Sequence, residues 1–311
     1  MAERLSASGR DQPPEPTRAP HCHATPATRL SHGPGGVAAP SAANRRSIVQ
    51  LSLIAAAIAL AAYAAVLAWM YLRQESLLFY PAPLAADQAF AIPDVHEVWI
   101  DVDGATLSAL HLTLPDPKGV VFFLHGNAGN LASWFTGSTF YRQANFDLFM
   151  IDYRGYGKSS GRIGSERELH ADVRKAWDRV AALYAGKRIV IYGRSLGTAL
   201  AAHLAAEVQP DLTILVSPFW SAQDLARIHF PWVPAALLRY PLAMNVDLRA
   251  IRTPVMLVHG ERDPLIPVDQ SERLLEVAPN GVLLRVRGAG HNDVHEFGEY
   301  LDAVARRLRE L

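Results

Sequence analysis

The chain has 311 residues, of which 50% are hydrophobic and 19% charged, with 30 Lys and Arg against 30 Asp and Glu. A composition this apolar excludes disorder of most of the chain and supports a large buried core. The net charge of zero lacks the basic excess that phosphate neutralisation requires, so nucleic acid is not an expected partner. A single cysteine, Cys22, excludes an intramolecular disulfide.

Residues 1–46 form a polar segment with seven prolines and no aromatic side chain. Such a composition cannot offset the entropy of ordering the chain, so we expect a disordered tail. His21, Cys22, His23 and His32 are metal-ligating residue types, but their spacing fits no closed zinc pattern. No metal site is therefore expected in the tail.

Residues 47–72 contain no charged side chain and exceed the ~20 residues that cross the hydrocarbon of a bilayer. A buried helix of a soluble protein is one alternative, although such a helix normally has a polar face. A cleavable signal peptide is another, because Ala62-Tyr63-Ala64 resembles a cleavage site. The length of the run, and Trp69 and Tyr71 at its end, favour an uncleaved transmembrane anchor.

Basic residues flank this segment unequally. Arg45 and Arg46 precede it, with Arg29 further back, whereas Arg73 stands beside Glu75 on the other side. Because positive charge is retained in the cytoplasm, we expect a cytoplasmic N-terminus. The C-terminal part is then predicted to be periplasmic or extracellular.

Three prolines over residues 73–94 mark a predicted linker, and residues 95–311 form the predicted catalytic domain. Apolar runs alternate there with helical patterns, as in an α/β fold with a mostly parallel sheet of eight strands and helices on both faces. The predicted strands are 95–102, 106–114, 120–124, 148–152, 189–192, 213–216, 255–258 and 282–286. The predicted helices are 131–143, 166–184, 196–208, 269–277 and 294–308.

One serine lies where a strand passes directly into a helix. Gly193-Arg194-Ser195-Leu196-Gly197 follows the strand at 189–192 and opens an alanine-rich helix. A nucleophile on so sharp a turn requires small residues two positions to either side, which the two glycines supply. Ser195 is therefore the predicted nucleophile.

A second match to the same pattern, Gly157-Lys158-Ser159-Ser160-Gly161, fails on context because Ser159 falls on a loop rather than between a strand and a helix. The same stretch imitates a phosphate-binding loop. The leading glycine of that motif would have to stand at position 152, which is Asp152. We therefore predict neither a second nucleophile nor a nucleotide site.

A serine hydroxyl needs a base to take its proton and an acid to orient that base. His291 follows the last strand on a glycine-rich turn, and we predict it as the general base. Asp263, on the loop after the strand at 255–258, is the predicted acid, with Glu261 and Asp224 as alternatives. The order Ser195, Asp263, His291 is one that a class of hydrolases uses.

A metal site made by His291, Asp293 and His295 is the alternative use of that turn. Its spacing of two suits a strand face rather than the helix start expected there, so neither a metal nor a cofactor is predicted. The other histidines, His259 among them, have no comparable context and are expected to be structural or exposed.

The oxyanion of an attacked carbonyl needs preorganised N–H donors. We predict the backbone N–H of Leu196, at the start of the helix, as one donor. The N–H of Asn127, in the flexible loop after the strand at 120–124, is the predicted second. His125 precedes that turn and is expected to bond loop backbone.

From about Val95 to its C-terminus the chain resembles the α/β-hydrolase superfamily in five motifs that occur in order. They are His125-Gly126-Asn127-Ala128, Asp152-Tyr153-Arg154-Gly155-Tyr156-Gly157-Lys158-Ser159-Ser160-Gly161, Gly193-Arg194-Ser195-Leu196-Gly197-Thr198, His259-Gly260-Glu261-Arg262-Asp263 and Gly288-Ala289-Gly290-His291-Asn292-Asp293. The chain is similar to the branch of membrane-associated serine hydrolases that includes protein depalmitoylases and bacterial anchored esterases.

This resemblance implies an α/β-hydrolase fold with a small cap, a Ser195–His291–Asp263 triad and an oxyanion hole at Asn127 and Leu196. Eukaryotic depalmitoylases of this type attach through a cysteine-rich, lipidated N-terminus, whereas this chain has an apolar segment and only Cys22. Ester or thioester hydrolysis is the activity that the resemblance implies despite this difference.

Aromatic and apolar residues gather between the strands at 213–216 and 255–258, as Phe219-Trp220, Phe230-Pro231-Trp232 and Leu237-Leu238. They form either a wall for an acyl chain or a helix packed on the sheet. The expected protein is a membrane-anchored serine hydrolase of acyl-lipid-like esters or thioesters, acting through an acyl-enzyme. The alternatives are a serine aminopeptidase-like peptide hydrolase and a catalytically inactive membrane-bound scaffold.

Overall fold

The computed structural model describes residues 42–311, so the predictions made for residues 1–41 lie outside the described residues. Helix α1 (Ala42–Leu72) begins before the boundary predicted at Ser47, because alanine and arginine are strong helix formers. Its residues Ala43–Leu72 are long and apolar enough to cross a membrane by length and composition. The chain divides into two compact units between Ala57 and Ile58.

The segment that follows α1 is folded, although a linker was predicted over residues 73–94. Helix α2 (Gln74–Leu78) is followed by strand β1 (Tyr80–Pro81), which pairs in parallel with β5 (Ala128–Gly129). Phe79 is buried and packs edge-on against the ring of Tyr240, with 5.2 Å between ring centroids. The prolines stop a helix from continuing here, but apolar side chains of the segment still pack on the domain, and its backbone groups still form hydrogen bonds with it.

An eight-stranded sheet runs through the domain in the order β10-β9-β8-β7-β4-β6-β3-β2. Strand β3 is antiparallel to both of its neighbours, and all other pairs are parallel, which confirms the predicted fold class. Each predicted strand is present, with ends shifted by at most two residues. The strands are β2 (Val95–Val102), β3 (Ala105–Leu112), β4 (Gly119–Leu124), β6 (Phe146–Ile151), β7 (Arg188–Arg194), β8 (Leu212–Val216), β9 (Val255–Gly260) and β10 (Gly281–Val286).

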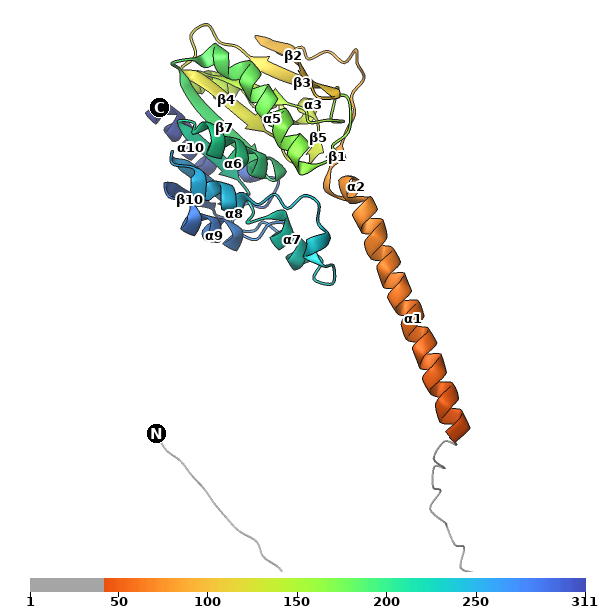
Figure 1. Cartoon of the computed structure of the whole chain (residues 1–311). Helices are drawn as coiled ribbons and strands as arrows, with labels where there is room; N and C mark the ends of the chain where they lie inside the picture. The colour runs from red at the N-terminus through yellow and green to blue at the C-terminus, as the bar shows by residue number, and fades with distance from the viewer. Residues whose placement is uncertain (1–41) are drawn as a thin grey trace, which may run out of the picture. The chain divides into compact units, whose positions relative to one another are not determined.

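Helices cover both faces of the sheet, which explains why its central strands are continuously apolar. In β4, Phe122 and Leu124 enter one core while Val121 and Phe123 enter the other, as alternation along a strand requires. Figure 1 shows α5 and α6 lying over the strands on one face. The first core takes residues from α5 (Glu166–Ala181), α6 (Leu196–Val208) and α9 (Asp269–Val277), and the second from α3 (Leu131–Trp134), α4 (Ser138–Ala144) and α10 (Gly298–Glu310).

Two predicted helices are each divided in the structure. The helix predicted over 131–143 breaks between α3 and α4, where Gly137 adopts a left-handed conformation with φ of 70°. The helix predicted over 294–308 begins as a 3-10 turn, Val294–Glu296, and restarts at Gly298 after an extended Phe297. A glycine inside each periodic pattern marks the break.

The cap is the segment of residues 217–254, between β8 and β9. It contains α7 (Ala222–His229), α8 (Met244–Asp247) and short 3-10 turns. Phe219 is buried in the first core, as packing on the sheet predicts. Phe230 and Trp232 are 48% and 50% exposed, so the aromatic residues at the tip of the cap do not pack on the sheet.

A buried ion pair joins the loop after β6 to helix α5. The guanidinium of Arg154 donates to both carboxylate oxygens of Asp172, at 2.5 and 2.9 Å, and also binds Glu168 and the carbonyl oxygen of Asp103. Both side chains of the central pair are only 5% exposed. Removal of one partner would leave an unpaired charge inside the protein, which is far more destabilising than loss of a surface pair.

We expect Asp172→Ala to lower the free energy of unfolding by about 3 kcal/mol. The matched control on the same helix is Asp178→Ala, which removes an exposed pair with Arg174 and should change stability by less than about 1 kcal/mol. Thermal unfolding of the full chain in detergent measures both. Equal shifts in the two variants would contradict a buried brace at this position.

Candidate active site

Ser195 lies on a strained turn between β7 and α6. Its φ and ψ of 51° and −121° are unusual for a residue with a side chain. The turn is possible because residues 193 and 197 are glycines. A Cβ at Gly197 would lie 2.0 Å from the carbonyl oxygen of Leu124, and a Cβ at Gly193 would lie 2.4 Å from the carbonyl oxygen of Gly197. Only glycine at these two positions permits the close approach that places Ser195 at the carboxyl edge of the sheet.

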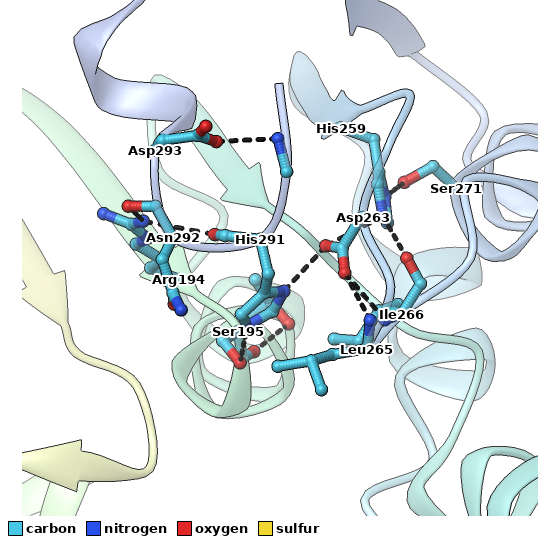
Figure 2. Close-up of polar contacts among 12 residues, drawn as sticks. Arg194, Ser195, His259, Asp263, Leu265, Ile266, Ser271, His291, Asn292 and Asp293 are labelled. Carbon is cyan, nitrogen blue, oxygen red and sulfur yellow. Dashed lines mark hydrogen bonds and ion pairs between the residues drawn. The ribbon is translucent and has the colours of Figure 1, made fainter. Parts of the chain in front are cut away.

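The structure brings together all three residues of the predicted triad (Figure 2). His291 Nε2 lies 3.0 Å from Ser195 Oγ, and His291 Nδ1 lies 2.7 Å from Asp263 Oδ2. Because a carboxylate only accepts, Nδ1 carries the proton and Nε2 is free to accept from the serine hydroxyl. This tautomer is the one that general-base catalysis requires.

Burial and hydrogen bonding fix the charge state of Asp263. Its side chain is completely buried, and burial alone would raise its pKa. The nearby His259 and His291 rings and the N–H of Ile266 more than compensate and hold the pKa of Asp263 well below its ordinary value. Oδ1 accepts from the N–H groups of Leu265 and Ile266 at 2.9 and 2.8 Å, which leaves Oδ2 to His291.

His259 supports the acid from the interior, a role that the sequence did not reveal. Its Nε2 donates to the carbonyl oxygen of Ile266 at 2.7 Å and lies 3.5 Å from Asp263 Oδ2. Its Nδ1 lies 2.6 Å from the hydroxyl oxygen of Ser271. His259 thereby holds the turn that carries Asp263, and its only signal in the sequence is its place four residues before the acid.

Arg194 holds the turn that carries His291. Its Nη2 donates to the carbonyl oxygens of His291 and Asn292, at 3.3 and 2.9 Å, and its guanidinium lies 5.4 Å from the ring of Trp134. Asp293 accepts from the N–H of Gly290 within the same turn. The residue beside the proposed nucleophile therefore positions the proposed base, which the motif alone does not indicate.

The two predicted oxyanion donors, Asn127 and Leu196, both border the cavity at Ser195. The carbonyl oxygen of Asn127 accepts from Tyr80 N–H at 2.9 Å and from the Tyr156 hydroxyl at 2.7 Å. Its side-chain amide donates to the carbonyl oxygen of Leu78 at 3.3 Å. Residues 78–80, in the predicted linker, therefore brace this loop.

In the part of the chain that the structure describes, the residues considered as alternative acids or as a second nucleophile form no hydrogen bond or ion pair with the triad. Glu261 is exposed, and Asp224 binds Arg273 and Gln270 rather than His291. Ser159 is buried, where it donates to the carbonyl oxygen of Asp152 and accepts from Ser108 N–H. His125 is fully buried and donates through Nδ1 to the carbonyl oxygen of Gly126, as expected for a residue that bonds loop backbone.

The metal alternative gains no support from the geometry. Within residues 42–311, no group of three or more His, Cys, Asp or Glu side chains is arranged to hold a metal ion. His295, one member of the alternative set, instead places its Nδ1 3.2 Å from the guanidinium of Arg194.

A cavity of about 560 Å³ opens beside Ser195. Its border is formed mainly by apolar side chains of the cap, of α2 and of the last turns of α1, with Gln74, Asn127 and His229 as polar members in addition to Ser195. The described residues that border it include no Asp, Glu, Lys or Arg. The size and apolar character are those of a small-molecule site.

Comparison with known proteins identifies the family of the chain. Residues 115–249 match the family of serine aminopeptidases S33, and residues 239–303 match the family of TAP-like proteins. Alpha/beta hydrolase domain-containing protein 17C of Xenopus tropicalis is 31% identical over 66% of this chain and 67% of its own length. The chain belongs to the α/β-hydrolase superfamily.

Other similar proteins extend the comparison. The human alpha/beta hydrolase domain-containing protein 17B is 35% identical over 61% of this chain, which spans 66% of the relative's length, just under two thirds. An uncharacterised protein of Mycobacterium tuberculosis is 30% identical over 83% of this chain and 94% of its own length. An esterase of Pyrococcus furiosus shares the fold, with a TM-score of 0.60 at 20% identity over 75% of this chain and 97% of its own.

We expect Asp263→Asn to lower kcat for a p-nitrophenyl ester by about 10⁴-fold, because an amide N–H facing Nδ1 imposes the wrong histidine tautomer. Glu261→Gln and Asp224→Asn are the matched controls, since each makes the same chemical change at an alternative acid. Both should keep kcat within about threefold. A large loss of kcat in one of the controls, together with an active Asp263→Asn variant, would show that the control residue is the acid.

Proposed function

We propose that this chain is a serine hydrolase that cleaves carboxylic esters or thioesters through an acyl-enzyme on Ser195. The observation that carries the proposal is the continuous chain of hydrogen bonds from Ser195 Oγ through the His291 ring to the buried carboxylate of Asp263. A strained turn, an oriented imidazole and a buried anion have no joint use in a merely structural role.

Each step follows from these positions. Ser195 Oγ attacks the acyl carbon as its proton passes to His291 Nε2, and the N–H groups of Asn127 and Leu196 stabilise the oxyanion. The tetrahedral species collapses and breaks the bond to the leaving group, which takes the proton from His291. Water then attacks the acyl carbon as its proton passes to Nε2, and the second tetrahedral species breaks its bond to Ser195 Oγ, which takes that proton back from His291 as the carboxylic acid leaves.

The cavity favours acyl esters or thioesters over peptides. An aminopeptidase must hold the positively charged N-terminus of its substrate, which calls for a carboxylate near the nucleophile. The described border of this cavity contains none. An apolar border instead suits the hydrocarbon of an acyl group.

We also propose that α1 anchors the protein in a membrane through the apolar segment of residues 47–72. Arg45 and Arg46, in the first turns of α1 and directly before residue 47, support a cytoplasmic N-terminus and a catalytic domain in the periplasm or outside the cell. The enzyme would then meet its acyl substrates at the surface of the membrane that holds it.

A fluorophosphonate should form a covalent adduct on Ser195 of the full chain, and Ser195→Ala should abolish it, because only an activated serine attacks this reagent. Ser159→Ala, in the second match to the same motif, is the matched control. It should keep the adduct on Ser195 while lowering thermal stability, since Ser159 is buried and hydrogen-bonded. Peptide mass mapping locates the adduct. A folded wild-type protein without an adduct would favour an inactive scaffold.

Membrane orientation is tested with two cysteines. Cys22 is the only native one, and Glu310→Cys in a Cys22→Ser background places another at the exposed end of α10. An impermeant maleimide should label the cysteine at position 310 in intact bacterial cells and Cys22 only after lysis. Labelling of Cys22 alone in intact cells would reverse the proposed orientation.

A further inference from the structure

One wall of the cavity beside Ser195 is made by the end of the long apolar helix, and not by the catalytic domain alone. Val66, Leu67 and Met70 of α1 border the same cavity as Ser195 and Leu196. We propose that the end of α1 is part of the substrate site and that a long acyl chain binds between it and the cap. This inference rests on the proposed hydrolase function and adds the residues that determine chain length.

The residues concerned share one face of α1. Tyr63, Leu67 and Met70 follow one another at spacings of four and three, which places them in one stripe along the helix, and Gln74, four residues further on, continues the stripe as the first residue of α2. We call this stripe the α1 wall; from Tyr63 to Met70 it extends about 10 Å. Leu67 and Met70 are partly buried, whereas Leu72, on the opposite side, is 72% exposed.

Hydrogen bonds fix the α1 wall to the cap at both ends. The hydroxyl of Tyr63 donates to the carbonyl oxygen of Trp232 at 2.7 Å. At the other end the side-chain amide of Gln74 donates to the carbonyl oxygen of Leu237, at 2.6 Å, and accepts from Arg239 N–H at 2.8 Å. Between these polar ends the wall presents only apolar side chains to the cavity.

The same segment reaches the proposed oxyanion hole. Two residues just after the α1 wall hold Asn127. The carbonyl oxygen of Leu78 accepts from its side-chain amide, and the N–H of Tyr80 donates to its carbonyl oxygen. One continuous stretch of chain therefore borders the cavity and braces the loop that would stabilise the reacting carbonyl. An acyl chain lying along the wall would have its carbonyl end directed to Ser195.

The length of α1 is consistent with this use. Its uncharged part, residues 47–72, has 26 residues that extend about 39 Å, whereas the hydrocarbon core is about 30 Å thick and needs about 20 residues. About six residues at the end of the helix, Leu67 and Met70 among them, are then left over for the catalytic domain. The half-exposed Phe230 and Trp232 of the cap lie beside this end, and such aromatic side chains favour the membrane interface. The occupant best matched to this site is the acyl chain of a bilayer component.

The test compares Met70→Trp, which fills the cavity from the α1 wall, with Leu72→Trp, which adds similar bulk on the opposite face. The full chain in detergent micelles hydrolyses p-nitrophenyl butyrate and p-nitrophenyl laurate, and the ratio of kcat/KM for laurate to that for butyrate is measured. Met70→Trp should lower this ratio about tenfold, the effect of taking about two methylene groups out of apolar contact. Leu72→Trp should leave it within about twofold.

An unchanged ratio in Met70→Trp, or equal changes in both variants, would overturn the role of the α1 wall. A short-chain fluorophosphonate checks that each variant is folded and active. Should Met70→Trp fail this check, Leu67→Phe, a smaller enlargement on the same face, decides the question by the same ratio. A wild-type protein that neither reacts with the reagent nor hydrolyses either ester would instead contradict the proposed function itself.

Discussion

The close approach of α6 to the end of β4 is the constraint on which the rest of the site depends. A side chain at Gly197 would collide with the Leu124 carbonyl oxygen, so only glycine permits the contact. This approach places Ser195 on its strained turn and sets Leu196 N–H beside the loop that carries Asn127. The buried sheet stabilises the strain, because strands on both sides of β7 are packed under helices. A proposed nucleophile and both proposed oxyanion donors thus depend on one backbone contact.

Polar support around the proposed triad is arranged in layers. Asp263 faces His291, while His259 and two backbone N–H groups hold the carboxylate from behind. Burial would otherwise raise the pKa of Asp263, and these partners keep it well below its ordinary value. The acid therefore stays ionised throughout the pH range in which enzymes are assayed, and a loss of activity at mildly acidic pH would report on another group.

The fold class and the proposed triad could be predicted from the sequence because each has a short local signal. Buried strands are continuous apolar runs, and Ser195 and His291 lie on glycine-rich turns directly after strands. Contacts between distant segments have no such signal. The bonds from Leu78 and Tyr80 to Asn127 join residues almost fifty positions apart, so the segment predicted as a linker could not be recognised as part of the site. The role of His259 depends in the same way on the folding of its loop around Asp263.

The position of the end of α1 and of the residues after it has a mechanistic consequence. A tether that only holds an enzyme near a membrane can be replaced by any other tether, because it raises local concentration without touching the reaction. In this chain the end of α1 borders the cavity, and the residues after it brace Asn127. Detaching the domain at residue 73 would remove a wall of the proposed substrate site, and cutting at residue 81 would also release the proposed oxyanion loop. Attachment and catalysis are thus coupled through residues 63–80, and a soluble version should lose activity on long chains before it loses its fold.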